Sequence, residues 1–317
     1  MSSSLFPVSP DLILTGFTTS PLVPSNIPHI ALVPLTDAAL GVHKVTAQTT
    51  HNVVSPPPPA SHHNGLNELD DALPTEAWEA FYPAGSINPG NKEAPRGGFG
   101  FYMRGPKAWK ETLDREGAGE VLVSYRVMFE EGWAWRKGGK LPGLYGGVGE
   151  SAYGCTGGRQ TDRCNCFNLR LMWRENGAGE LYAYLPHHAP NPEQMVKVPP
   201  KSVQHPDYGF SVGMGSFYFA PGVWTTVAER LKMNTIGQAD GEIEVYIDGK
   251  SVIRVQGIVL RDAASSESHV QGIHFQTFFG GHSNDWASPK PQRAYFGHVS
   301  GAILRSPSGV QHLHEEL

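Results

Sequence analysis

Alternating apolar and polar residues predict two neighbouring β-strands near the middle of the chain. In residues 167–173 every second side chain is a large apolar one, so these side chains share one face of an extended strand. In residues 180–185 the aliphatic side chains share a face, and Tyr182 and Tyr184 share the other. The glycine-containing segment between the runs predicts a hairpin-like turn. The polar faces then bring an amide, a guanidinium and two phenols together, which indicates a polar ligand.

The apolar faces also constrain the register of this hairpin, because a slip of one residue would turn a whole face over. The simplest register pairs three sets of residues across the two strands: Arg174 with Glu180, Met172 with Tyr182, and Arg170 with Tyr184.

The rest of the chain beyond residue 120 is also predicted to be mainly β-strand. Extended runs occupy residues 121–129, 224–233, 242–247, 251–253, 269–279 and 292–304. Asp248-Gly249 joins two of these runs and supplies the positive φ of a type I′ turn. A short helix is expected over residues 74–80, with Thr75 as its N-cap. Many short strands with few helices predict an all-β fold, a β-sandwich or jelly roll.

The N-terminal segment differs in composition. Residues 1–65 are rich in Pro, Ser and Thr, include four consecutive prolines at 56–59, and show little hydrophobic periodicity. We therefore expect 1–65 to be a disordered or loosely docked tail and 66–310 to form the folded domain. No Lys or Arg precedes Lys44, and prolines interrupt every apolar stretch, so a standard secretion signal is not expected.

Composition excludes some classes of partner. The 317 residues carry a net charge of −5, which argues against a nucleic-acid binder held by bulk electrostatics. No apolar run approaches the length of a membrane span, so we expect no membrane partner. We expect a monomer. Any polyanionic ligand must meet a local basic patch.

Three cysteines, Cys155, Cys164 and Cys166, lie close together in the sequence. One short-range disulfide and one spare thiol fit this count, and Cys155–Cys164 is the preferred pair. A zinc site is the rival interpretation, but the Cys-x-Cys spacing lacks the usual two-residue gap. A disulfide would imply an oxidising compartment, which conflicts with the missing signal and leaves the localisation open.

A glycine-rich segment precedes the hairpin and contains Lys140-Leu-Pro-Gly-Leu-Tyr-Gly-Gly. The glycines lack phosphate-loop spacing, but they allow close approach of a ligand to the backbone, with Lys140 offered from a loop. Together with the polar-x-Arg and Tyr-x-Tyr strands, this motif resembles polysaccharide lyase family 14, the alginate and glucuronan lyases. Further support comes from Trp-Glu-Ala-Phe-Tyr-Pro at 78–83 and from Phe-Phe-Gly-Gly-His at 278–282.

This resemblance extends over residues 75–304 and implies a concanavalin-like jelly roll with a substrate groove across one concave sheet. It also implies β-elimination of an acidic polysaccharide, a 1,4-linked uronate polymer. The resemblance implies that the positions of the family's catalytic residues correspond to Lys140, Asn168, Arg170, Tyr182 and Tyr184 in this chain. Asn168 departs from the family's serine, and because an amide cannot ionise, substrate preference or pH behaviour could differ. The resemblance also implies a disulfide between Cys155 and Cys164, which lie where the family has a bonded cysteine pair.

The implied chemistry needs these residue types. Removal of the C5 proton of a uronate requires the carboxylate to be neutralised, which Arg170, Asn168 and Lys140 could do. A base must take the proton and an acid must protonate O4. Tyr184, opposite Arg170 in the expected register, is the favoured base, with Tyr182 positioning substrate and Lys140 as the alternative base. No metal or other cofactor is required by this scheme.

Other side chains are candidates for lining the groove. We expect substrate contacts from Tyr145, His274, Gln276 and His282, and stacking on sugar rings from Trp133, Trp135 or Trp286. A non-catalytic, lectin-like sandwich that binds acidic glycans is the alternative function. Glycoside hydrolysis is a weaker alternative, because the polar face of the hairpin offers only Glu180 where two carboxylates are needed.

Overall fold

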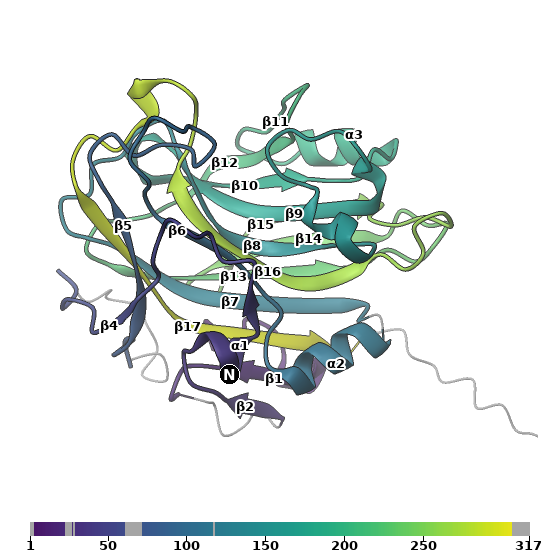
Figure 1. The fold of residues 1–317 in the computed structure, drawn as a ribbon. Helices are drawn as coiled ribbons and strands as arrows, with labels where there is room; N and C mark the ends of the chain where they lie inside the picture. The colour runs from purple at the N-terminus through teal and green to yellow at the C-terminus, as the bar shows by residue number, and fades with distance from the viewer. Residues whose placement is uncertain (1–2, 23–26, 28, 61–71, 117, 306–317) are drawn as a thin grey trace, which may run out of the picture.

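The protein folds as two β-sheets packed face to face, as the computed structural model shows (Figure 1). The structure describes residues 3–22, 27, 29–60, 72–116 and 118–305. The expected all-β jelly-roll sandwich is confirmed, with few helices: α1 (Asp37–Leu40), α2 (Lys107–Glu116) and α3 (Pro190–Val196). In the described part of the chain, no helix is both long and apolar enough to cross a membrane.

The first sheet has β7 and β17 near its centre. Its strands follow the order β15 (Lys250–Ile258), β14 (Gly241–Ile247), β13 (Trp224–Lys232), β7 (Glu120–Phe129), β17 (Gln292–Leu304), β1 (Ile13–Thr18) and β2 (Ile30–Leu32), with β5 (Ala77–Tyr82) also paired to β17 and β4 (Val53–Val54) paired to β5.

The second sheet carries the hairpin that the sequence analysis singled out. Its order is β11 (Val203–Gln204), β12 (Phe210–Tyr218), β10 (Ala178–Tyr184), β9 (Cys166–Trp173), β8 (Gly139–Gly147), β16 (His269–Phe279), β6 (Phe99–Met103) and β3 (Val42–His43). All eight strands are antiparallel to their neighbours.

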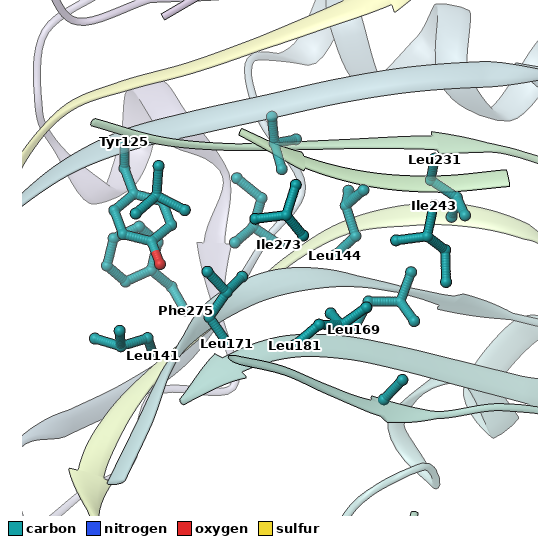
Figure 2. Close-up of a cluster of buried hydrophobic side chains, with 14 of the residues drawn as sticks. Tyr125, Leu141, Leu144, Leu169, Leu171, Leu181, Leu231, Ile243, Ile273 and Phe275 are labelled. Carbon is teal, nitrogen blue, oxygen red and sulfur yellow. The ribbon is translucent and has the colours of Figure 1, made fainter. Parts of the chain in front are cut away.

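Apolar side chains from the inner faces of both sheets form the main core. Leu144 of β8, Leu169 of β9 and Ile273 of β16 point toward Leu231 of β13 and Ile243 of β14 (Figure 2). Each of these five side chains is almost completely buried. A fully buried aliphatic side chain contributes about 1.5–3 kcal/mol relative to an exposed one, so this layer accounts for much of the stability of the sandwich.

The predicted alternation holds in β9, and the predicted hairpin joins β14 to β15. The apolar face of β9, which includes Leu169 and Leu171, lies in the main core, and the polar positions face away from it. Asp248 and Gly249 have φ values of 48° and 78°, as a type I′ turn requires.

Two expectations about the N-terminal part of the chain are wrong. Residues 77–82 form strand β5, paired to β17, in place of the helix expected over 74–80. Residues 13–18 form β1, which pairs along β17 inside the first sheet, so this segment is neither disordered nor a loosely docked tail. Leu5 and Phe6 are buried in a second apolar cluster with residues of the same sheet, such as Leu122. Residues 61–71 and 306–317 lie outside the described residues.

Candidate active site

One row of paired residues crosses the second sheet from β10 to β6. Tyr182 of β10 lies opposite Arg170 of β9, and Arg170 lies opposite Gly143 of β8. Gly143 lies opposite His274 of β16, which in turn lies opposite Tyr102 of β6. Directly paired residues share a face of a sheet, so these side chains project from the same surface, away from the core. This surface is where we locate the candidate active site.

The observed register of β9 and β10 differs by two residues from the expected one. Tyr182 pairs with Arg170, and Tyr184 pairs with Asn168. The turn is tighter than assumed, because β10 already begins at Ala178. A shift of two residues leaves every side chain on its original face, so the expected faces are correct although the expected partners are wrong.

Arg170 extends across β8 toward β16. Its Nη1 donates to Oε1 of Gln276 at 2.6 Å, and the side chain is buried. Gly143 lies between these two strands, and a Cβ built at Gly143 would be only 1.9 Å from the carbonyl oxygen of Leu169, so no larger residue fits. Among the described residues, nothing pairs with the buried Nε of Arg170. The guanidinium stays charged although burial lowers its pKa, and it keeps a donor for an anionic ligand.

Lys140 lies within strand β8, where a loop was expected, and is buried. Its Nζ donates to Sδ of Met172 at 2.9 Å and lies 3.0 Å from the centroid of the Tyr182 ring. Burial holds the pKa of Lys140 well below its usual value, and the charges of Arg170 and Arg174 lower it further. A neutral amine at this position can accept a proton.

A bulge in β8 determines where Lys140 points. Lys140 lies opposite Met172 and Tyr145 lies opposite Asn168, so Lys140 and Tyr145 share a face although they are five residues apart. In a regular strand an odd separation puts side chains on opposite faces. Here the register shifts between Lys140 and Gly143, which adds one residue to β8.

Two buried polar side chains of the first sheet contact the backbone of β8, one within this bulge and one directly after it. The hydroxyl of Tyr125 in β7 donates to the carbonyl oxygen of Pro142 at 3.1 Å. The backbone N–H of Leu144 donates to Oε2 of Glu229 in β13 at 2.8 Å. Burial raises the pKa of Glu229 to about 8. The sequence alone gave no sign of these contacts, because they join distant strands of different sheets.

Asn168 and His274 form a buried hydrogen-bonded pair beside Arg170. Nδ2 of Asn168 donates to Nδ1 of His274 at 3.0 Å, and the His274 ring stacks on Tyr102 at a centroid distance of 4.2 Å. Burial lowers the pKa of His274 well below its usual value, with further lowering by Arg170 and Lys140, so the ring is neutral. Oδ1 of Asn168 is buried with no partner within the described ranges.

The two tyrosines of β10 lie side by side with ring centroids 5.5 Å apart. Burial raises the pKa of Tyr182, and neighbouring Tyr184 raises it further, so the Tyr182 hydroxyl keeps its proton at neutral pH. Tyr184 is buried more deeply, with the Arg163 guanidinium 4.8 Å from its ring centroid. Tyr182 is therefore the phenol that lies against Lys140, whereas both tyrosines lie near the Arg170 guanidinium.

Glu180 is the carboxylate of β10 nearest to this cluster. It is completely buried, and its two oxygens accept hydrogen bonds from Arg174 at 2.6 Å and from the Ser211 hydroxyl at 2.5 Å. Because both oxygens are occupied, Glu180 is poorly placed to act as an acid or base on a sugar.

Comparison with known proteins identifies the family of this chain. The family profile described as Polysaccharide lyase 14 matches residues 72–299. The chain belongs to this family. The crystal structure of the marine PL-14 alginate lyase from Aplysia kurodai is 33% identical, with a TM-score of 0.60 over 72% of this chain and 83% of that chain.

More distant structures share the fold of this polysaccharide lyase. Alginate lyase vAL-1 from Chlorella virus is 22% identical, with a TM-score of 0.58 over 84% of this chain and 93% of that chain. Alginate lyase Aly36B is 20% identical, with a TM-score of 0.52 over 74% of this chain and 82% of that chain. No curated protein sequence matches the chain.

The remaining predicted groove residues of this lyase lie in different surroundings. Tyr145 is completely buried, with its ring 4.7 Å from that of Tyr102. Gln276 contacts Arg170 directly. His282 is exposed in the loop after β16, where its ring centroid lies 6.5 Å from that of Tyr208.

The predicted stacking tryptophans also lie in different surroundings. Trp133 belongs to the main core and Trp135 packs against it, so neither projects from the face that carries Arg170. The ring centroid of Trp286 lies 6.0 Å from the guanidinium carbon Cζ of Arg174.

The disulfide joins Cys155 to Cys166 and leaves Cys164 as an exposed free thiol, so the expected Cys155–Cys164 pair is wrong. Cys166 is the first residue of β9 and shares a face with Asn168 and Arg170. The disulfide packs against Tyr184 at one end of the candidate active site. Within the ranges that the structure describes, no group of three or more His, Cys, Asp or Glu residues could hold a metal ion.

Proposed function

We propose that this lyase cleaves a 1,4-linked polyuronate by β-elimination at the face that carries Lys140, Arg170 and Tyr182. The observation that supports it most is the juxtaposition of a charged guanidinium, with Nε free of partners in the described chain, and a lysine whose pKa is strongly lowered. A uronate supplies both a carboxylate for Arg170 and a weakly acidic C–H for the amine of Lys140. The relative from Aplysia kurodai, an alginate lyase, supports the same substrate class.

Arg170 and Asn168 bind the carboxylate of the sugar that loses its C5 proton. An ionised carboxylate makes this proton very weakly acidic, because its removal concentrates negative charge on one group. The guanidinium of Arg170 offsets that charge and stabilises the enolate-like dianion as it develops. Asn168 is already oriented by neutral His274, so its amide is held in place before substrate binds.

Lys140 acts as the base. Tyr184 was favoured for this role because the expected register placed it opposite Arg170, and that reason no longer holds in the observed register. The lowered pKa of Lys140 leaves a fraction of neutral amine at neutral pH, whereas the Tyr182 hydroxyl keeps its proton.

Tyr182 acts as the acid. The C5–H bond breaks and its proton goes to Nζ of Lys140, while the electron pair forms the C4–C5 double bond. The bond from C4 to O4 breaks, and the departing oxygen takes the hydroxyl proton of Tyr182. Because Tyr182 keeps its proton at neutral pH, it can donate that proton to O4 as the C4–O4 bond breaks, so that no free alkoxide forms.

The one-sided arrangement selects the configuration of the sugar. Lys140 and Tyr182 project from the same face of the sheet, so base and acid reach the sugar from one side. In D-mannuronate and D-glucuronate the C5 hydrogen and O4 lie on the same side of the ring, whereas in L-guluronate they lie on opposite sides. The substrate is therefore a polymannuronate or a glucuronan.

A panel of polymannuronate, polyguluronate and glucuronan tests this function. We expect ultraviolet absorbance from the unsaturated product with polymannuronate or glucuronan, and much less with polyguluronate. Folded protein that yields no unsaturated product from any of the three polymers would refute the proposed function.

Variants of the same site test the assigned roles. Arg170→Ala and Lys140→Ala should abolish turnover. Tyr182→Phe should lower kcat by at least about 10²-fold, as loss of a general acid does, and Tyr184→Phe should have a smaller effect. Equal loss in both phenylalanine variants would contradict the assignment of the acid to Tyr182.

A further inference from the structure

The row of residues that crosses the candidate active site does not end at Tyr102. Strand β3 (Val42–His43) pairs with β6 and places His43 directly opposite Tyr102, on the same face as His274 and Arg170. Strand β3 precedes the family match, which begins at residue 72. The N-terminal segment thus adds an edge strand to the sheet that binds substrate.

Two aromatic rings and three nitrogen-bearing side chains gather at this edge. We call His43, Lys44, Tyr102, Arg104 and Tyr153 the β3 cluster. The Tyr153 hydroxyl contacts Nε2 of His43 at 2.9 Å and accepts from Nη2 of Arg104 at 2.8 Å. The Tyr102 and Tyr153 rings are perpendicular, with centroids 4.7 Å apart. Nζ of Lys44 lies 4.2 Å from the Tyr153 ring centroid.

The β3 cluster is continuous with the candidate active site. Tyr102 stacks on His274, and His274 accepts the hydrogen bond of Asn168. Four strand spacings separate His43 from Arg170, which at about 4.8 Å each amounts to about 19 Å. That distance is several sugar residues, so one polymer chain lying across the strands can reach both places.

The chemistry of the β3 cluster fits an anionic sugar. Lys44 and Arg104 provide two positive charges, and Glu150, which is 3.1 Å from Lys44, is the one carboxylate in contact with either of them among the described residues. The cluster keeps a net positive charge although the protein as a whole carries −5. Lys44 is 46% exposed, so a ligand in solvent can reach it. Charged donors beside aromatic rings suit a carboxylate and the apolar face of a pyranose.

We propose that the β3 cluster is a distal subsite, which binds a second uronate carboxylate of the same polymer several residues away from the bond that is cleaved. This inference rests on the proposed function, because it assumes the same substrate. Binding there contributes to affinity for long chains and not to the chemical step, since the two cationic side chains of the cluster, Lys44 and Arg104, contact Tyr153 and not Lys140, Arg170 or Tyr182. The enzyme should therefore favour polymers over short oligomers.

The test compares Lys44→Ala and Arg104→Gln, singly and combined, with the unmodified enzyme. We expect the double variant to raise KM for the polymer about tenfold, with kcat unchanged. With the shortest oligouronate that the enzyme cleaves, kcat/KM should stay the same. Lys250→Ala is the matched control, because it removes one exposed positive charge from the first sheet. Equal losses on polymer and short oligomer, or no loss on the polymer, would overturn the distal subsite.

A binding measurement separates this inference from the proposed function. Lys140→Ala protein, with and without the Lys44→Ala and Arg104→Gln changes, is titrated calorimetrically with the polymannuronate and glucuronan polymers. Weaker binding in the triple variant supports the distal subsite whether or not the enzyme turns over. Unchanged binding refutes it, whereas absence of unsaturated product in the unmodified enzyme refutes the proposed function alone.

Discussion

The carboxyl group of Glu229 in one sheet accepts a hydrogen bond from the backbone N–H of Leu144 in the other, at 2.8 Å. This contact crosses the core and holds the bulge that turns Lys140 toward the candidate active site. A buried side chain far from substrate thereby controls the position of the proposed base.

Replacing Glu229 with Leu should lower kcat more than it changes KM. Leucine cannot accept the Leu144 N–H, so the bulge relaxes and Lys140 shifts, and a displacement of about 1 Å at a reacting group can lower a rate about 10²-fold. Glu229→Gln keeps an acceptor oxygen and should retain activity within a few-fold. Val227→Ala is the control, since Val227 is a buried core residue of the same strand. If Glu229→Gln and Glu229→Leu lose kcat equally, the positioning role is wrong.

Glu229 should also make stability depend on pH. Burial raises its pKa from 4.5 in the unfolded chain to about 8 in the folded protein. Between these values the folded protein holds a proton that the unfolded chain has lost, so rising pH favours unfolding. The stabilisation is complete below pH 4.5 and is lost as pH rises to about 8. We expect Tm of the unmodified protein to fall across this window relative to Glu229→Gln. Parallel Tm profiles for the two proteins would show that Glu229 does not titrate there.

Replacing Lys140 with Met should abolish activity and raise Tm at neutral pH. The lowered pKa means that the folded protein gives up a proton that the unfolded chain keeps, so Lys140 reduces stability below its unfolded pKa of 10.5. A gain of several degrees is expected, since about 1 kcal/mol shifts Tm by about 2–4 °C in a domain of this size. The difference should shrink as pH approaches 10.5. Lower Tm in Lys140→Met at neutral pH would mean that the lysine is charged and stabilising.

The three cysteines should differ in their contributions to stability and activity, because Cys155 and Cys166 form the disulfide and Cys164 does not. Cys166→Ser should lower the free energy of unfolding by about 2–4 kcal/mol, because it opens a covalent loop, and should reduce activity because the disulfide packs against Tyr184. Cys164→Ser should leave both unchanged, since this thiol is exposed. Chemical denaturation and product absorbance measure the two effects. A large effect of Cys164→Ser would instead favour the pairing expected from the sequence.

The sequence by itself predicted the class of fold and the residue types of the candidate site. Alternation along β9 and β10 depends only on backbone geometry, so the faces that carry Arg170, Tyr182 and Tyr184 could be assigned without knowing any partner strand. The Asp248-Gly249 turn could be assigned for the same reason, because a local backbone preference determines it.

Only the tertiary structure decided which of these residues meet. The β9–β10 register depends on where the turn closes, and the direction of Lys140 depends on a bulge held by Glu229 from another sheet. The placement of β1 and β3 depends on strands that follow them by many residues, so a segment without periodicity of its own still enters both sheets. Contacts between distant parts of the chain leave no periodic trace in a single sequence, and such contacts set the geometry of this site.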